Sequence, residues 1–225
     1  MTAPRIFPCT DNLTREDFRN GVYDPDSDSF CLMDAIEKDW ETIRKNGIPH
    51  VIFDFGSGSG ILSAHFRMLL DTIERTNHMS VFYCLDINPY ATRASLNTLR
   101  HNPVTANCPA EALCCDVSRV ESLKRFYGMA DIILWNPPYV PSVDDPSGDY
   151  ACAGGTDGTA FIRQMFPTAV RLLSSSGYLY VLLIEQNNPS KIAEFFCETY
   201  KLWVDVVFQR LSGERYTILR FRKPK

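Results

Sequence analysis

Residues 51–62 read V-I-F-D-F-G-S-G-S-G-I-L, an apolar run that ends at Asp54 and continues into glycines at alternate positions, Gly56, Gly58 and Gly60. Glycine adopts tight-turn backbone angles and lets a ligand approach the main chain without meeting a Cβ atom. We therefore predict a strand, a glycine-rich turn and a helix, in that order. This unit is typical of α/β folds that bind nucleotides or nucleosides.

Strand-like and helix-like segments alternate through the rest of the chain. This alternation predicts the α/β class, with a doubly wound, mostly parallel seven-stranded sheet that ends in an antiparallel hairpin. The predicted strands cover 50–55, 81–85, 112–115, 132–135, 178–184, 203–210 and 216–222, and the predicted helices cover 29–44, 61–75, 90–100, 118–127, 158–173 and 189–200.

We expect one globular unit in which an N-terminal extension, 1–47, packs a helix on a core domain, 48–225. No apolar run reaches the roughly 18 residues needed to span a bilayer, and residues 1–20 lack a secretory pattern. The expected location is therefore the cytoplasm, with the nucleus as a second location and no membrane contact. The eight cysteines form no C-x-x-C pair, so we expect reduced core thiols and no metal site.

The charge balance bears on the class of substrate. The formal net charge is −4, from 23 basic and 27 acidic residues. Proteins that bind duplex DNA usually present a basic face that neutralises several phosphates. The composition therefore disfavours nucleic acid and favours a protein or small-molecule substrate.

Polar residues follow successive predicted strands. Asp54, Asp86, Asp116 and Asn136 each lie at a strand's carboxyl end. In a doubly wound sheet these ends meet at one edge, where ligands bind. The sequence therefore predicts that the four side chains converge on one crevice.

The spacing of the glycines bears on the ligand. Dinucleotide sites usually have G-x-G-x-x-G, whereas this chain has G-x-G-x-G, preceded by an acidic residue that would repel a phosphate. Asp54 suits a cationic ligand such as S-adenosyl-L-methionine, which carries a sulfonium and an ammonium group and becomes S-adenosyl-L-homocysteine. Asp86 would accept from the ribose hydroxyls. Asp116 fits either an adenine amine or the capping of the next helix.

Residues Asn136-Pro137-Pro138-Tyr139 are the predicted catalytic element. Consecutive prolines remove backbone donors and stiffen the turn, so a carbonyl and the Asn136 side-chain oxygen become two acceptors aimed at one point. A planar NH2 group offers two matching donors, and holding it this way frees the nitrogen lone pair to attack a methyl group. The Tyr139 ring would lie on the flat face of the amide or base.

Together these motifs resemble the HemK-type glutamine N5-methyltransferases, in the eukaryotic and archaeal branch that acts on the class I translation termination (release) factor. The resemblance implies the class I methyltransferase (Rossmann-like) fold and N5-methylation of the glutamine in a Gly-Gly-Gln motif. The matching segments are Tyr23-Asp24-Pro25-Asp26-Ser27-Asp28-Ser29-Phe30, Phe53–Gly60, Asp86–Pro89, Asn136–Pro141, Ala153–Gly158 and Asn187–Pro189. The chain departs from the family pattern at Asp24 and Asp54, where glutamate is usual, and at Ser27, which replaces an acidic residue.

The resemblance also implies site residues and a partner. Asn136, Pro137, Pro138 and Tyr139 would hold the substrate glutamine. The partner would be a small zinc-binding activator subunit in a heterodimer, and the short apolar edge strand Ala112–Cys115 is its predicted docking site. The implied cofactor contacts are Ser29, Asp54, Gly56, Gly58, Gly60, Asp86, Ile87, Asp116, Val117 and Asn136.

Three alternatives stay open at this point. An N6-adenine methyltransferase acting on DNA or RNA would use the same N-P-P-Y element, and other protein side chains such as lysine are further acceptors. A catalytically silent scaffold would not need that element. A nicotinamide oxidoreductase is disfavoured by the glycine spacing.

Overall fold

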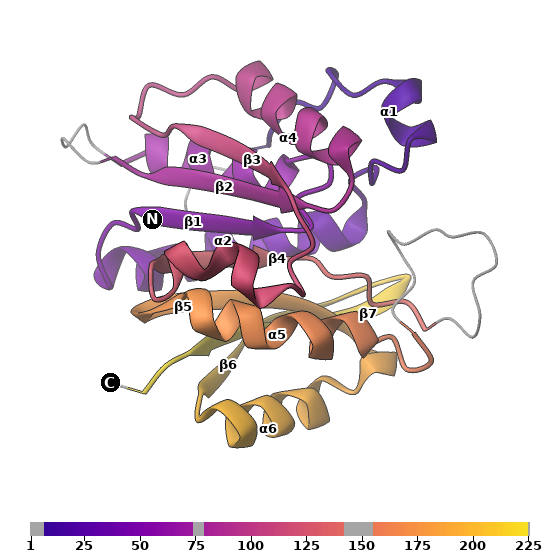
Figure 1. The fold of residues 1–225 in the computed structure, drawn as a ribbon, viewed down its shortest axis with the longest axis vertical. Helices are drawn as coiled ribbons and strands as arrows, with labels where there is room; N and C mark the ends of the chain where they lie inside the picture. Colours follow the sequence, from indigo (N-terminus) through magenta and orange to yellow (C-terminus); the bar gives the residue numbers. More distant parts are fainter. Residues whose placement is uncertain (1–6, 74–78, 142–154, 225) are drawn as a thin grey trace.

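A seven-stranded sheet forms the centre of the computed structural model, which describes residues 7–73, 79–141 and 155–224 (Figure 1). The strand order is β3-β2-β1-β4-β5-β7-β6, and only β7 runs antiparallel to its two neighbours. This confirms the predicted doubly wound sheet and its C-terminal hairpin. The strands are β1 (Val51–Phe55), β2 (Val81–Asp86), β3 (Ala110–Cys114), β4 (Ala130–Trp135), β5 (Leu173–Ile184), β6 (Trp203–Ser212) and β7 (Glu214–Arg222).

Helices cover both faces of the sheet (Figure 1). One buried apolar cluster joins α2 and α3 to one face, and a second joins η1, α5 and α6 to the other. The helices are α1 (Arg15–Arg19), α2 (Ser27–Lys45), α3 (Ile61–Asp71), α4 (Pro89–His101), α5 (Ala160–Leu172) and α6 (Pro189–Tyr200), with 3-10 helices η1 (Val120–Phe126) and η2 (Glu185–Asn187).

Helix α2, from the N-terminal extension, is part of the core. Its N-cap is Asp26, and its buried residues follow helical spacing: Cys31, Leu32, Ala35, Ile36, Trp40 and Ile43. The carboxylate of Asp39 on the same helix accepts from the Tyr180 hydroxyl at 2.7 Å and from Arg220 Nη1 at 2.5 Å. Apolar burial and these bonds hold the extension against strands β5 and β7.

The segment predicted as a helix over 118–127 is instead the 3-10 helix η1. Leu123 and Phe126 of this segment are buried and lie three positions apart. That spacing suits the three residues per turn of a 3-10 helix as well as one face of an α-helix.

Other departures from the predicted elements are smaller. Strand β5 begins at Leu173, five residues before the predicted start, and the register with β4 shifts between Ala130 and Ile132. Strand β3 ends at Cys114, so Cys115 of the predicted edge strand lies beyond it. Helix α1 was not predicted, although Thr14 and Asp17 form its capping box. Of the family segment Ala153–Gly158, the first two residues lie outside the described residues.

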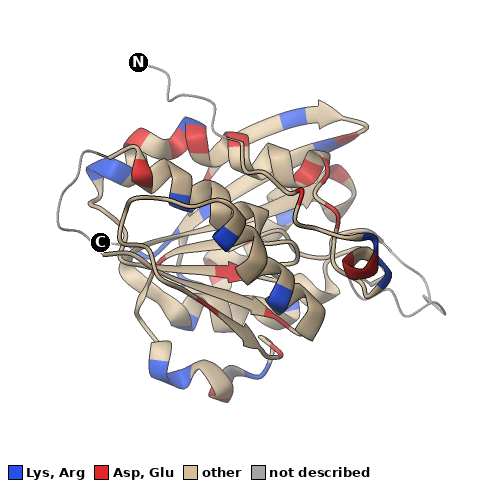
Figure 2. Ribbon diagram, turned by 90° about the horizontal axis from the view of Figure 1, so that it is seen from above, with Lys and Arg blue, Asp and Glu red and all other residues tan. Residues whose placement is uncertain are grey.

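Several features bear on the class of protein. Among the residues that the structure describes, no helix is long and apolar enough to cross a membrane, and no three metal-ligating side chains gather to hold an ion. The described cysteines are free thiols, three of them buried. Figure 2 shows basic residues interspersed with acidic ones on helices and strands.

Gly177 provides a test of the β4–β5 junction. A Cβ atom at this position would lie 2.3 Å from the carbonyl oxygen of Ala130. We expect Gly177→Ala to lower the free energy of unfolding by about 1–3 kcal/mol, because the buried strand would have to shift. Exposed Ser175 on the same strand is a control, and Ser175→Ala should change stability by less than about 0.5 kcal/mol. Equal urea midpoints for the two variants would contradict this account.

Candidate functional site

Strands β1, β2 and β4 end at the same level of the sheet. Phe55 of β1 pairs with Leu85 of β2 and with Trp135 of β4. The residues that follow these paired positions therefore lie at one edge of the sheet: Gly56, Asp86 and Asn136. The predicted convergence of all four polar residues, Asp54, Asp86, Asp116 and Asn136, on one ligand remains a prediction.

The glycine-rich turn after β1 requires glycine for two different reasons. Gly56, Gly58 and Gly60 all have positive φ, at 63°, 51° and 80°. A Cβ atom on Gly60 would lie 2.6 Å from Cα of Ser95, so this glycine lets the turn pack on α4. A Cβ atom on Gly56 would meet nothing within 4 Å, and the exposed main chain there is open to a ligand.

Asp54 is a buried carboxylate with one oxygen unused. It is 1% exposed, and its Oδ2 accepts from the Ser63 hydroxyl of α3 at 2.7 Å. Its Oδ1 is buried and accepts no hydrogen bond among the described residues. Burial raises the pKa of Asp54 to about 7. A cationic group is the partner that such an oxygen lacks.

Asp86 ties the glycine turn to the end of β2. Its Oδ2 accepts from the Gly58 amide at 2.9 Å, and its Oδ1 accepts from the Asn88 amide at 2.9 Å. Burial raises the pKa of this carboxyl group. The neighbouring Ile87 is an apolar side chain that is 65% exposed, at the edge where a flat ligand is predicted. The predicted ribose and ligand contacts of these two residues remain predictions.

Asp116 accepts hydrogen bonds within the turn before η1, and its predicted role as the cap of the next helix is wrong, because the N-cap of η1 is Arg119. Its Oδ1 accepts from the Ser118 amide at 2.9 Å and from the Ser118 hydroxyl at 2.6 Å. The hydroxyl bond is the main cause of the lowered pKa of Asp116. The adjacent Val117 is buried. An adenine contact from Asp116 or Val117 stays a prediction.

The entry segment before α2 lies against the glycine turn. Cβ of Tyr23 is 3.5 Å from the position of a Cβ atom on Gly58. Ser29, a predicted cofactor contact, is buried in the first turn of α2, where its amide donates to Asp28 Oδ1 at 2.5 Å. The N-terminal extension therefore forms one wall of the candidate site.

The catalytic element after β4 is held by that same wall. Oδ2 of Asp28 accepts from Nδ2 of Asn136 at 3.0 Å and from the hydroxyls of Tyr139 at 3.0 Å and Tyr23 at 2.9 Å. Oδ1 of Asn136 is buried and accepts no hydrogen bond among the described residues. Burial and then the Asp28 charge raise the pKa of Tyr139, so its hydroxyl remains a donor.

A second group of bonds fixes the main chain of this element. Asn187, buried at the end of β5, donates from Nδ2 to the Tyr139 carbonyl at 2.8 Å and accepts the Ile184 amide at 2.9 Å. A Cβ atom on Gly158 would lie 2.0 Å from that same carbonyl oxygen, which makes the glycine obligatory there. The turn that contains Pro137 and Pro138 is thus clamped on both sides.

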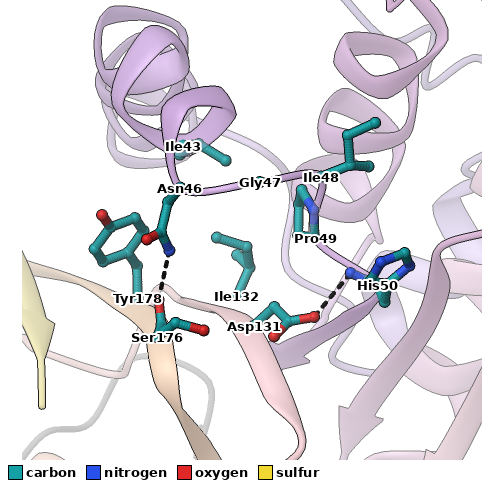
Figure 3. Close-up of a pocket in the computed structure, with 10 residues that line it drawn as sticks. All are labelled: Ile43, Asn46, Gly47, Ile48, Pro49, His50, Asp131, Ile132, Ser176 and Tyr178. Carbon is teal, nitrogen blue, oxygen red and sulfur yellow. Dashed lines mark hydrogen bonds between the residues drawn. The ribbon is translucent and has the colours of Figure 1, made fainter. Parts of the chain in front are cut away.

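A cavity of about 270 Å³ lies at the opposite end of the sheet (Figure 3). Its polar groups are paired with one another. Asn46 Nδ2 donates to the Ser176 carbonyl at 2.6 Å, and the His50 amide donates to Asp131 Oδ2 at 2.8 Å. Since these polar groups are satisfied and lie at the amino ends of the strands, the cavity is not the candidate site.

A family model identifies the protein family to which this chain belongs. The family model described as methyltransferase small domain matches residues 23–205, which include both the entry segment and the catalytic element. The chain belongs to this family of methyltransferases. The matched range also contains the ends of strands β1, β2 and β4, where the candidate site lies.

Relatives narrow the assignment to the HemK type, as the sequence motifs predicted. Methyltransferase HEMK2 of Mus musculus is 31% identical over 229 residues, covering 99% of this chain and 100% of that protein. The eRF1 methyltransferase catalytic subunit mtq2 of Schizosaccharomyces pombe is 26% identical, covering 95% of this chain and 94% of that protein. Mtq2 in the solved E. cuniculi Mtq2-Trm112 complex has a TM-score of 0.61 at 22% identity, covering 90% of this chain and 98% of that one, which confirms the fold.

Two residues that hold the candidate site were not among the predicted site residues. Asp28 was noted only within a capping cluster and a family motif, and Asn187 only within a family motif. Their signals were weak, because an acidic residue near a helix start and an Asn before a Pro are both common local caps. Only the fold brings them to Asn136 and Tyr139.

Asp54 should reduce the stability of the ligand-free methyltransferase at alkaline pH. Its folded pKa, about 7, lies above the ordinary value near 3.9, so the folded state binds more protons between these values and loses stability as pH rises through them. We therefore expect Asp54→Asn to raise the melting temperature relative to wild type at pH 8, with the gain shrinking toward pH 4. Thermal melts across this range measure the difference. If Asp54→Asn were less stable than wild type at pH 8, the raised pKa of Asp54 in the folded protein would be contradicted.

Proposed function

We propose that this methyltransferase transfers a methyl group from S-adenosyl-L-methionine to N5 of the glutamine in the Gly-Gly-Gln motif of the eukaryotic and archaeal class I peptide chain release factor. The name of the fission-yeast relative, an eRF1 methyltransferase catalytic subunit, supports the substrate. The observation that carries the proposal is the buried Asn136 Oδ1, an acceptor at a strand end with no donor among the described residues.

The residues present fit the cofactor. Asp54 Oδ1 is a buried carboxylate oxygen without a partner among the described residues, which suits the ammonium group of an amino acid. Gly56 leaves its main chain open, and Ile87 offers exposed apolar surface for a flat ring. When bound, S-adenosyl-L-methionine supplies an electrophilic methyl group on a cationic sulfur.

The chain's own groups then position the acceptor amide. Asn136 Oδ1 accepts a hydrogen bond from the glutamine NH2 and holds the nitrogen in place. Asn187 and the two prolines fix the backbone of the turn, so little rearrangement accompanies the reaction. Tyr139 stays protonated because its hydroxyl donates to Asp28, and it does not act as a base.

Mass spectrometry of the release factor tests this function directly. Incubation of a eukaryotic release factor with the enzyme and cofactor should add one methyl group to the glutamine of Gly-Gly-Gln. Asn136→Ala should lower kcat by about 100-fold or more, because one positioned hydrogen bond to the reacting group is lost. Calorimetric titration of S-adenosyl-L-methionine should show a much smaller loss of affinity.

Asn46→Ala is the matched control, since Asn46 lies at the opposite end of the sheet. It should retain the wild-type rate. Methylation of adenine in DNA or RNA, or of lysine in proteins, with no label on the release factor would overturn the proposal in favour of those acceptors.

A partner and a location complete the proposal. We infer that a small zinc-binding activator docks on β3, the edge strand next to β2. The solved E. cuniculi relative is a complex with Trm112, and the exposed Cys114 at the end of this strand suits an apolar partner strand. Such a complex would act in the cytoplasm, where translation terminates, with the nucleus as a second location.

Co-expression tests the partner. The chain alone should be poorly soluble, because the β3 edge and its apolar neighbours would be uncovered, and co-expressed activator should raise the soluble yield several-fold. Gel filtration should then give a heterodimer. A stable, fully active monomer expressed alone would contradict this part of the proposal.

A further inference from the structure

We propose that Asp28 is a positioning residue that determines which end of the Asn136 amide faces the acceptor substrate. The inference rests on the proposed function, in which Asn136 Oδ1 accepts from the substrate NH2, and its experiments use the chain co-expressed with the proposed activator. Asp28 lies in the first turn of α2, and Asn136 follows β4, 108 positions later in the chain.

The Asp28 carboxylate is the acceptor in each of its hydrogen bonds to the described residues. Oδ1 takes the Ser29 amide, and Oδ2 takes Asn136 Nδ2 and the hydroxyls of Tyr23 and Tyr139. Four donors around one carboxyl group leave no place for a second acceptor. If the Asn136 amide turned over, its carbonyl oxygen would face a carboxylate oxygen at hydrogen-bond distance.

Because Asp28 is buried, it strongly favours one orientation of the Asn136 amide. Asp28 is 2% exposed, so water does not compete for its oxygens. In a dry environment a charge-assisted hydrogen bond is stronger, and an unpaired acceptor is more costly, than at the surface. The Nδ2 end of Asn136 is therefore held against Asp28, and the Oδ1 end points away from it, where no described residue donates to it.

The isosteric change Asp28→Asn reverses this arrangement. If the new amide kept its oxygen toward Asn136, its NH2 group would face the Ser29 amide, donor against donor. If it turned over, its NH2 would face Asn136 Nδ2, and Asn136 would restore a bond only by turning over itself. The hydroxyls of Tyr23 and Tyr139 adapt to either state, because a hydroxyl both donates and accepts.

Nuclear magnetic resonance of the 15N-labelled full chain tests the clamp without any substrate. The Asn136 side-chain signal is identified by its disappearance in Asn136→Ala. In the wild type, one Nδ2 proton should be shifted downfield and exchange slowly, because it is donated to a buried carboxylate. In Asp28→Asn it should shift upfield and exchange faster. An Asn136 signal that is unchanged by Asp28→Asn would overturn the proposal.

Kinetics test the consequence for catalysis. We expect Asp28→Asn to lower kcat on the order of 100-fold, the loss that misplacing a reacting group can cause, with the KM for the release factor changed much less. In the Asn136→Ala background the same change should lower kcat by less than about threefold, since residues that act as a unit are not additive. An equal loss in both backgrounds would show that Asp28 acts elsewhere and would also overturn the proposal.

Asp39→Asn is the matched control. Asp39 is a buried carboxylate on the same helix and also accepts from a tyrosine hydroxyl, that of Tyr180. This variant should lower the melting temperature but leave the Asn136 signal and the kcat of the folded enzyme unchanged. If the wild-type chain did not methylate the release factor, the proposed function would fail, whereas the resonance experiment would still decide the role of Asp28.

Discussion

At the ends of β1 and β4, two buried oxygen atoms accept no hydrogen bond among the described residues: Oδ1 of Asp54 and Oδ1 of Asn136. Each such atom costs on the order of 1–3 kcal/mol, because water that would pair with it has been excluded. A ligand that supplied the missing donors would remove this cost. The candidate site depends on this constraint, since one oxygen is charged and suits a cation, and the other is neutral and suits an amide NH2.

Neighbouring side chains hold these oxygens in place by bonding to the other polar atom of the same carboxyl or amide group. Ser63 of α3 holds Oδ2 of Asp54, and Asp28 of α2 holds Nδ2 of Asn136. Both helices lie on the same face of the sheet and share one apolar cluster. The packing of the N-terminal extension is therefore coupled to the geometry of the reacting groups.

Local sequence was enough to predict the strand ends and the glycine turn, because strand periodicity and alternate glycines act within a few residues. It was not enough for Asp28, whose contact with Asn136 spans 108 positions. For Asp116 the sequence did not separate two roles. A hydrogen bond to Ser118 within a turn and a contact with a ligand both require an acidic side chain, so the sequence alone left both roles open. The α-helix predicted over 118–127 was wrong, because two apolar residues three positions apart fit a 3-10 helix equally well.

The residue type at position 136 follows from its two neighbours. It donates to the Asp28 carboxylate on one side and, in the proposed function, accepts from a planar NH2 group on the other. A carboxylate would meet Asp28 oxygen against oxygen, at the distance where the amide now donates at 3.0 Å, and could remain only by taking up a proton. An apolar side chain would satisfy neither neighbour. Only an amide has an NH2 and a carbonyl at opposite ends, and the shorter asparagine, directly after the strand and before two prolines, leaves its amide little freedom to move away.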